Sequence, residues 1–481
     1  MLEDLIKERE RKLGKYQYFS DPYPADSRRD LVLKEAKDSF VKLKKSKKSI
    51  FLTGRIRAWR DQGKIIFADI EDESGKFQLV LDQKHLDKFD LVKETFDVGD
   101  FIEARGLMYE TKRGELSLLA TKARLLAKSL RPIPQDWYGL EDIETRLRKR
   151  YLDLLINREV RDSFVKKGIF WDAIRSFLKN SGFLEVETPV FELVPGGADA
   201  EPFVTHHNAL DRDFYLRISL ELPLKKLLVG GFEKVFEIGR IFRNEGIDRE
   251  HLQDYTQMEC YWAYADHESM MKFIEKMYKT VIKKILGKTT LFIQGKNIDW
   301  GKKWPKIDYY EVFKKETGID LDIVKTEELK EKAKKLGLKI EQGFGRGRLI
   351  DLIYKKLVRP KLVNPCFLIG HPIEISPLAK ADSKNPKKVL RFQILAFGSE
   401  LGNGWSEVNN PIDQKKRFEE QMKLRAAGDK EAQRFDEDFI EALEYGMPPA
   451  AGFGLSERLF AVLVDKPIRE TSLFPLMKEE K

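Results

Sequence analysis

The stretch EKVFEIGRIFRNEGIDREHLQDYTQMECYWAY, residues 233–264, is the most informative part of the chain. Its beginning, VFEIGRIFR, alternates apolar with polar side chains, and so does its end, YTQMECYWAY. The segment NEGIDREHLQD between them is rich in turn-forming residues. Alternation with a period of two is typical of half-buried strands. The stretch therefore predicts two strands that are joined by a polar loop.

Four side chains around this loop are candidates for binding a nucleotide. Arg243 and Glu245 lie on the same face of an extended segment, because strand side chains repeat every two residues. An arginine fork can hold two phosphate oxygens, and a carboxylate can accept hydrogen bonds from an exocyclic amine such as that of adenine. His251 and Tyr255 add a phosphate contact and a flat ring for stacking. The alternative is an ordinary hairpin with an Arg–Glu salt bridge, which explains most isolated Arg-x-Glu pairs.

The N-terminal part of the chain has a different pattern. Residues 1–48 have helical spacing and end in the lysine-dense run VKLKKSKKS. From Ser49 to residue 127 five or so short alternating segments follow, separated by turn signals such as DESG at 72–75. Short strands at this spacing predict a small closed barrel of the oligonucleotide-binding type.

The second half of the chain mixes helices and strands. The segment RPIPQDWYGLEDIETRLRKR, residues 131–150, contains two prolines and marks a domain junction. Residues 160–182 have one apolar helical face and end at Gly182, which suits a helix C-cap. Mixed elements continue to residue 481, with a lysine-rich helical stretch from Lys325 to Lys335. The fold class is therefore α+β.

Composition narrows the possible functions. The 481 residues include 88 Lys or Arg and 79 Asp or Glu, a formal net charge of +9 that permits a nucleic-acid partner but does not demand one. The two cysteines, Cys260 and Cys366, exclude a disulfide framework and a cysteine-based zinc cluster. The N-terminus is charged and no run of about 18 apolar residues occurs, so no membrane association is expected. A reducing, cytoplasmic location is predicted.

Three motifs together resemble a known enzyme class. F-R-N-E, a loop and H-x-x-x-Y in 242–255 are similar to the second signature motif of class II aminoacyl-tRNA synthetases. GFLEVETPV at 182–190 resembles the first motif, and GFGLSERLFAVL at 452–463 resembles the third. The longer blocks 194–248 and 400–421 are similar to the lysyl-tRNA synthetases of that class, and the similarity extends over nearly the whole chain.

The resemblance implies a fold and a reaction. It implies an N-terminal OB-fold β-barrel, which binds the anticodon, and a catalytic domain with an antiparallel sheet flanked by helices. The implied boundaries are 1–130 for the N-terminal helix and anticodon-binding domain, 131–150 for a hinge, and 151–481 for the catalytic domain with an insertion around 300–360. Such enzymes form homodimers through the first motif. They activate L-lysine with ATP to lysyl-adenylate and transfer it to the 3′ end of lysine tRNA.

The resemblance also implies an ATP site with Mg²⁺. The ATP-binding residues would be Arg243, Glu245, His251, Tyr255, Glu400 and Arg458, of which Arg243, His251 and Arg458 would assist catalysis. The substrate α-carboxylate is itself the nucleophile, so no general base is required. The metal-holding pair maps to Gln393 and Glu400, where the amide of Gln393 replaces the usual glutamate and predicts weaker or fewer metal contacts. The third motif is one residue shorter than expected before Arg458.

Two recognition sites follow from the same match. Three glutamates would surround the lysine, because carboxylates suit a diammonium ligand and an unpaired buried cation is costly. The implied lysine-binding residues are Gly197, Glu221, Glu259, Tyr261, Asn403, Trp405 and Glu407; Trp405 stands where the family commonly has a smaller aromatic residue. In the barrel, Phe67, Gln78 and Glu115 would read the anticodon. Taken alone, each glutamate and Gln78 would be surface residues and Phe67 a core residue.

Three hypotheses remain open. The first is a lysine-specific synthetase that charges tRNA. The second is a paralogue that attaches a lysine-type amino acid to a protein; such paralogues lack the barrel, so residues 49–127 argue against it. The third is a catalytically retired RNA-binding homologue, suggested by Gln393 and the altered third motif. The joint presence of the other ATP-site residues argues against the third hypothesis.

Overall fold

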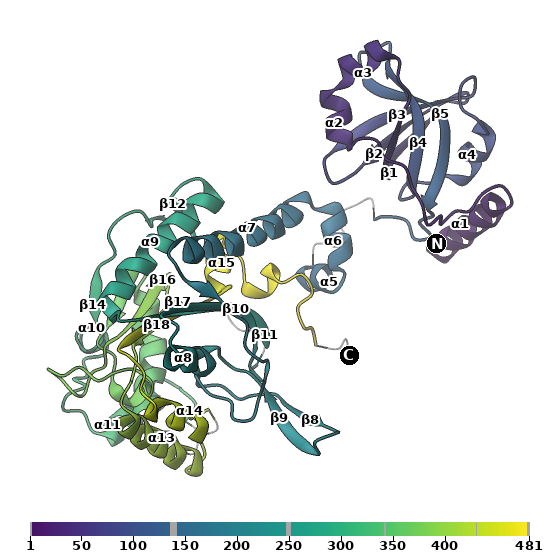
Figure 1. The fold of residues 1–481 in the computed structure, drawn as a ribbon. Coiled ribbons are helices and arrows are strands. Elements are labelled where there is room, and N and C mark those ends of the chain that lie inside the picture. The colour runs from purple at the N-terminus through teal and green to yellow at the C-terminus, as the bar shows by residue number, and fades with distance from the viewer. Residues whose placement is uncertain (1, 135–141, 247–251, 341–342, 430, 479–481) are drawn as a thin grey trace. The chain divides into compact units, whose positions relative to one another are not determined.

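The computed structural model describes residues 2–134, 142–246, 252–340, 343–429 and 431–478. The chain divides into two compact units, Met1–Asp142 and Ile143–Lys481 (Figure 1). Of the segment 131–150, which the sequence suggests as a hinge, residues 135–141 lie outside the described residues. Residues Ile143–Arg148 form helix α5, which belongs to the second unit.

The first unit is the predicted barrel with helices around it. Its elements are α1 (Leu2–Gln17), α2 (Leu33–Asp38), α3 (Phe40–Ser46), β1 (Ile50–Asp61), β2 (Ile65–Glu71), β3 (Lys76–Asp82), α4 (Phe89–Thr95), β4 (Phe101–Glu110) and β5 (Leu116–Ala127). The strands close in the order β1-β2-β3-β5-β4, and only the pairing of β3 with β5 among these is parallel. Ile66, Ala68 and Ile70 of β2 are fully buried, whereas Phe67 between them is partly exposed. Alternate side chains of the strand therefore point into the packed barrel interior and to its outer surface.

The second unit is built on one large sheet. Its strand order is β14 (Lys306–Asp308), β15 (Cys366–Ile369), β16 (Arg391–Ala396), β17 (Ser399–Ser406), β18 (Ala450–Ser456), β11 (Asp254–Ala263), β10 (Lys234–Phe242) and β6 (Leu184–Glu185). The six central strands are antiparallel, as expected, but the outermost pair at each edge is parallel. The sheet is therefore mixed. The predicted strand, loop and strand at 233–264 are β10 and β11, paired from Lys234 with Trp262 to Phe242 with Asp254.

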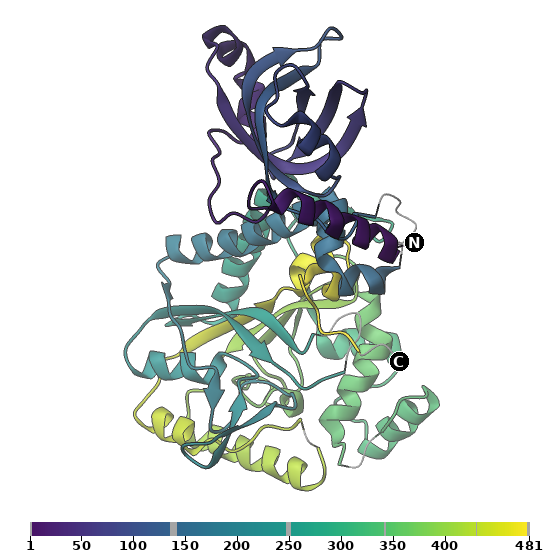
Figure 2. The same cartoon turned by 90° about the vertical axis from the view of Figure 1, so that its right-hand side faces the viewer.

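Helices cover both faces of this sheet (Figures 1 and 2). On one face, α7 (Arg158–Asn180), α9 (His267–Leu286) and α15 (Arg458–Leu463) pack into the largest apolar cluster, with Met258 and Cys260 of β11. On the other face, α8 (Glu221–Val229), α13 (Pro411–Ala426) and α14 (Glu437–Glu444) form a second cluster with Tyr261. Because neighbouring strand residues point to opposite faces, Glu259 and Tyr261 leave the main core and turn towards α8.

The segment 300–360 is part of the second unit, and its first strand belongs to the large sheet. Its first strand, β14, extends the main sheet, and α10 (Tyr309–Thr317), α11 (Thr326–Lys335) and α12 (Arg346–Ile353) follow. These helices share an apolar cluster with Cys366, Leu368 and Leu395 of the sheet. Smaller elements are the three-stranded sheet β7 (Phe191–Glu192), β9 (Arg212–Leu216) and β8 (Val204–His207), and the hairpin β12 (Thr290–Ile293) with β13 (Lys296–Asp299).

Within the described ranges, no helix is both long and apolar enough to cross a membrane.

Candidate active site

A cavity of about 740 Å³ opens on the sheet face that carries α8. It is lined by residues of β11, β16, β17 and β18, by the segment that follows β10, by α8, and by α12 from the 300–360 segment. Every described residue that the sequence assigns to lysine or ATP lines it, except Glu407, whose carboxylate lies just beneath the lining residues Trp405 and Gly452. His251, the remaining predicted ATP-site residue, lies outside the described residues.

The three predicted glutamates converge at one end of this cavity. Glu221 begins α8, Glu259 lies in β11 and Glu407 follows β17, and their exposed fractions are 1%, 4% and 1%. The fully buried Lys225 lies between two of them: its Nζ contacts Glu221 and is 2.5 Å from Glu407 Oε2. When all are ionised, three carboxylates and one ammonium leave two negative charges uncompensated, which a doubly cationic ligand would neutralise.

Glu259 is held by a full set of donors. Its Oε1 accepts hydrogen bonds from the Ser219 hydroxyl at 2.7 Å and from the Leu220 backbone N–H at 2.9 Å. The amide of Gln257 donates to the same oxygen at 2.6 Å, and the Tyr261 hydroxyl donates to Oε2 at 2.8 Å. These bonds hold the carboxylate at a defined place in the cavity wall.

Glu407 is held on one side only. The indole Nε1–H of Trp405 donates to its Oε2 at 2.8 Å, and Lys225 contacts the same atom. Its Oε1 is buried and has no hydrogen-bond partner among the residues that the structure describes. A buried carboxylate oxygen without a donor is costly unless a ligand supplies one. Glu407 therefore presents one open acceptor atom.

Burial and mutual repulsion govern the protonation of this cluster. Burial raises the pKa of Glu221, and the neighbouring Glu407 and Glu259 charges raise it further, while Lys225 opposes the rise. Burial likewise raises the pKa of Glu407, against the influence of Lys225 and Trp405. Burial disfavours the charge of Lys225, but the attraction of Glu221 and Glu407 outweighs it and raises the pKa of this ammonium. Any added ammonium group would favour the ionised carboxylates.

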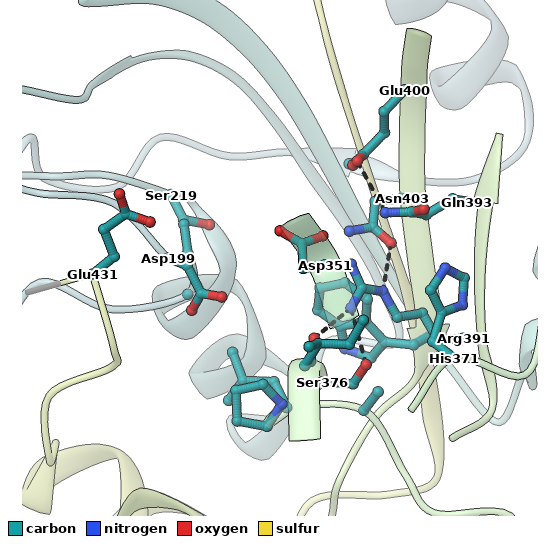
Figure 3. Close-up of a pocket in the computed structure, with 18 of the residues that line it drawn as sticks. Asp199, Ser219, Asp351, His371, Ser376, Arg391, Gln393, Glu400, Asn403 and Glu431 are labelled. Atoms are coloured by element: carbon teal, nitrogen blue, oxygen red, sulfur yellow. Dashed lines mark hydrogen bonds between the residues drawn. The ribbon is translucent and has the colours of Figure 1, made fainter. Parts of the chain in front are cut away.

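Backbone geometry brings Gly197 against this acidic cluster. Its φ is +84°, and a Cβ there would lie 2.9 Å from the Cβ of Glu221 and from Ser219. Glycine is therefore required for the close approach of this backbone. Asn403 lies further along the wall, where its Oδ1 accepts from Arg391 Nε at 3.0 Å (Figure 3).

The cavity wall also carries the predicted nucleotide-binding side chains. Arg243 follows β10; its Nε donates to the Ile218 carbonyl at 3.2 Å, and its guanidinium lies 5.8 Å from the centre of the Tyr255 ring. Gln253 donates to the backbone carbonyls of Glu245 at 3.2 Å and Gly246 at 3.3 Å, which holds the start of the loop. An arginine fork and an aromatic ring in one cavity wall suit a phosphate next to a base.

The altered third motif still delivers its arginine to the cavity. Strand β18 remains paired with β11 as far as Ser456, opposite Gln257. Arg458 then begins α15, and its Nη1 donates to the Glu400 carbonyl at 3.4 Å. The buried Glu457 before it is paired with Lys167 of α7. The shorter loop is thus compatible with an arginine among the nucleotide-binding side chains.

Gln393 and Glu400, the predicted metal pair, bond to each other. The Gln393 amide donates to Glu400 Oε2 at 2.9 Å (Figure 3). The side-chain oxygen of Gln393 accepts from the Tyr354 hydroxyl at 3.5 Å. Only one carboxylate is present in this pair. Over the described part of the chain, no group of three or more His, Cys, Asp or Glu residues is arranged to hold a metal ion.

The predicted anticodon residues share the outer face of the barrel. Phe67 and Asp69 lie on the same side of β2, Asp69 pairs with Gln78 of β3, and Gln78 pairs with Ser117 of β5. The Ser117 hydroxyl donates to Gln78 Oε1 at 2.8 Å, and the exposed Glu115 lies just before β5. An aromatic ring, an amide and a carboxylate on one surface suit recognition of unstacked bases.

Sequence reasoning missed Lys225 in the acidic cluster and the partner of Arg60 in the barrel. Lys225 stands four residues after Glu221 in a helical segment, and this i,i+4 spacing of opposite charges was the available signal. Arg60 in the barrel is held by Asp69 through two hydrogen bonds of 2.8 and 2.9 Å, which no local pattern indicates.

Comparison with known proteins agrees with this geometry. Residues 142–478 match the family of tRNA synthetases class II (D, K and N), and residues 50–126 match the OB-fold nucleic acid binding domain. The chain therefore belongs to the class II tRNA synthetases of the D, K and N group, with an N-terminal OB-fold domain. Enzymes of this class use ATP.

The following relatives share one name, lysine–tRNA ligase. The lysine–tRNA ligase of Moorella thermoacetica is 48% identical over 90% of this chain and 89% of its own length. The lysine–tRNA ligase of Carboxydothermus hydrogenoformans is 45% identical over 99% and 98%, and that of Roseiflexus castenholzii is 45% identical over 95% of each.

Proposed function

We propose that this protein is a lysine–tRNA ligase, which activates L-lysine with ATP and transfers it to the 3′ end of lysine tRNA. The observation that carries the proposal is the buried cluster of Glu221, Glu259 and Glu407 beside Arg243. A pocket for aspartate would instead need basic side chains at the acidic cluster. The names of the relatives support the same substrate.

Charge complementarity orients the bound lysine. Its α-ammonium group lies against Glu221 and Gly197, and its side-chain ammonium reaches the open Oε1 of Glu407 beside Tyr261. The α-carboxylate then points towards Arg243 and the nucleotide. Both cations of the substrate are thereby paired in a buried site.

The reaction needs positioning and charge stabilisation. An oxygen of the α-carboxylate forms a bond to the α-phosphorus of ATP as the bond to the bridging oxygen breaks, and pyrophosphate leaves. A terminal ribose hydroxyl of the tRNA then attacks the lysyl carbonyl, and AMP leaves. Arg243 and Arg458, assisted by His251, stabilise the charge on the phosphoryl oxygens, while Glu245 and Tyr255 hold the adenine.

Of the pair Gln393 and Glu400, only the Glu400 carboxylate suits Mg²⁺ as a ligand. Mg²⁺ commonly uses one or two carboxylates together with substrate phosphates, and Glu400 supplies one. Gln393 donates its amide hydrogen to Glu400, which keeps that carboxylate in place. The metal, when bound with ATP, neutralises phosphate charge.

The remaining assignments rest on the same function. Residues 1–130 form the anticodon-binding domain, with Phe67, Gln78 and Glu115 as its reading residues, and 131–150 form the hinge. Residues 151–481 form the catalytic domain, which dimerises through the first motif. The cytoplasm, where tRNA is charged, is the proposed location.

Two assays test the proposal against its alternatives. We expect ATP–pyrophosphate exchange that depends on lysine, followed by charging of lysine tRNA. Exchange without charging would favour the paralogue that modifies a protein, although residues 50–126 match a nucleic-acid-binding domain. RNA binding without exchange would favour the retired homologue.

The anticodon assignment gives a separate prediction. Phe67→Ala should raise the KM for lysine tRNA about tenfold or more, because stacking of one base on an aromatic ring contributes roughly 1–3 kcal/mol. Lysine-dependent exchange should stay unchanged, since the substitution is in the first unit. Phe101→Ala is the matched control, because Phe101 is also a partly exposed aromatic residue of the barrel. Equal KM values for both variants would remove Phe67 from the anticodon site.

A further inference from the structure

The side chain of Glu407 has two unequal oxygens. Two donors contact Oε2: the Lys225 ammonium Nζ at 2.5 Å and the Trp405 indole Nε1–H at 2.8 Å. A carboxylate oxygen has two lone pairs, so these two donors saturate Oε2. Oε1 is buried without a donor among the described residues.

The open oxygen faces the floor of the cavity. A Cβ at Gly452 would lie 2.2 Å from Glu407 Oε1 and 2.4 Å from the Tyr261 ring. Both Gly452 and Tyr261 line the cavity. The glycine therefore leaves room for the Glu407 carboxylate directly against the cavity wall.

Trp405 is itself held in place. The Arg391 guanidinium lies 5.6 Å from the centre of its ring. Arg391 in turn donates to Asn403 at 3.0 Å and to the Ser376 hydroxyl at 2.9 Å (Figure 3). The indole ring is thus contacted over its face by Arg391 while its N–H donates to Glu407.

We propose that Trp405 is a positioning residue that makes Glu407 a one-oxygen acceptor, and that the pocket thereby selects a side-chain ammonium over a guanidinium. The inference rests on the proposed function and adds a determinant of its specificity. An ammonium needs only one acceptor oxygen, whereas a guanidinium fork is bound best by both oxygens of a carboxylate. With Oε2 saturated, arginine loses half of that interaction.

Two substitutions separate the hydrogen bond from the size of the ring. Trp405→Phe removes the donor and the second ring. Trp405→His also removes the second ring but keeps an N–H, because its Nε2 occupies the same position along the side chain as the indole Nε1. At about pH 8 the imidazole is mostly neutral. Trp262→Phe is the control, since Trp262 packs against Phe183 and Phe273 in the sheet core.

The measurements are lysine-dependent exchange and its inhibition by arginine. We expect Trp405→Phe to raise the KM for lysine about tenfold and to lower the inhibition constant of arginine about tenfold, with kcat nearly unchanged. Trp405→His should restore both constants to within about threefold of the original enzyme, as one donor hydrogen bond is retained. Equal gains in arginine binding in the two variants would mean that loss of the second ring, and not loss of the hydrogen bond, admits arginine. This result would overturn the inference.

A pH profile provides a readout that a purely structural role would not change. Glu407 is faced by Glu221 and Lys225 of α8 and by Glu259 and Tyr261 of β11, and the Trp405 hydrogen bond opposes the rise of its pKa. The acid limb of kcat/KM for lysine should move to higher pH in Trp405→Phe and return in Trp405→His. If the acid limb of Trp405→Phe stays at the pH of the unaltered protein, the inference is overturned. This outcome does not depend on whether Trp405→His folds. Absence of lysine-dependent exchange in the unaltered protein would instead refute the proposed function.

Discussion

Arg243→Gln is expected to reduce kcat/KM for lysine-dependent ATP–pyrophosphate exchange about 10³-fold, because one well-placed donor to a transition-state oxyanion contributes a factor of about 10²–10³. Glutamine keeps hydrogen-bonding ability but loses the charge and the fork. The Nε of Arg243 is anchored on the Ile218 carbonyl, so the guanidinium is oriented before ATP binds. The KM for lysine should change much less than kcat, since the three glutamates bind both ammonium groups of lysine and Arg243 faces only its α-carboxylate.

Arg240→Gln is the control for that experiment. Arg240 lies in β10, three residues before Arg243, but it is exposed and paired with Asp254. The Arg240→Gln substitution should lower kcat/KM for exchange by less than about twofold, as expected for a surface ion pair. If Arg243→Gln lowers kcat/KM by less than about tenfold, the assigned role is contradicted, because loss of a group that stabilises phosphoryl charge should lower the rate more than this.

The sequence was informative where a local pattern determines a local structure. Alternation in 233–264 predicted β10 and β11, and the same alternation determines that Glu259 turns away from the core residues Met258 and Cys260. Similarity to a known family then brought Glu221, Glu259 and Glu407 together, although they lie far apart along the chain. Periodicity alone could not do this, because it does not determine strand order in a sheet.

Side-chain pairing within the site could not be predicted in the same way. Whether Trp405 bonds Glu407 depends on rotamers that are set by Arg391, and these come from packing across strands. The bond between Gln393 and Glu400 likewise needs the register of β16 and β17, including its bulge. The role of 300–360 was also hidden, since a lysine-rich helix indicates a solvated surface but does not reveal that β14 joins the main sheet.

Lys225→Met is expected to destabilise the second unit by about 3–5 kcal/mol near neutral pH, because it leaves buried carboxylates without their counter-ion. Glu221 and Glu407 both contact this ammonium, and all three side chains are almost completely buried. Thermal or denaturant unfolding followed in the second unit would measure the loss. Lys226→Met is the matched control, because Lys226 is the next residue of α8, is partly exposed and pairs with Asp438; it should change stability by less than about 1 kcal/mol.

The deficit of Lys225→Met should depend on pH in a defined direction. Lys225 lowers the pKa of both glutamates, so its removal raises their folded-state values further above the ordinary 4.5. Acids with raised pKa bind more protons when folded, and stability is therefore lost as pH rises from the unfolded value through the folded one. The deficit should be smallest near about pH 5 and largest near about pH 9. Added lysine should restore part of the stability at high pH, since it supplies ammonium groups to the same carboxylates. A deficit that is independent of pH would show that Lys225 acts through packing and not as the counter-ion of the pocket.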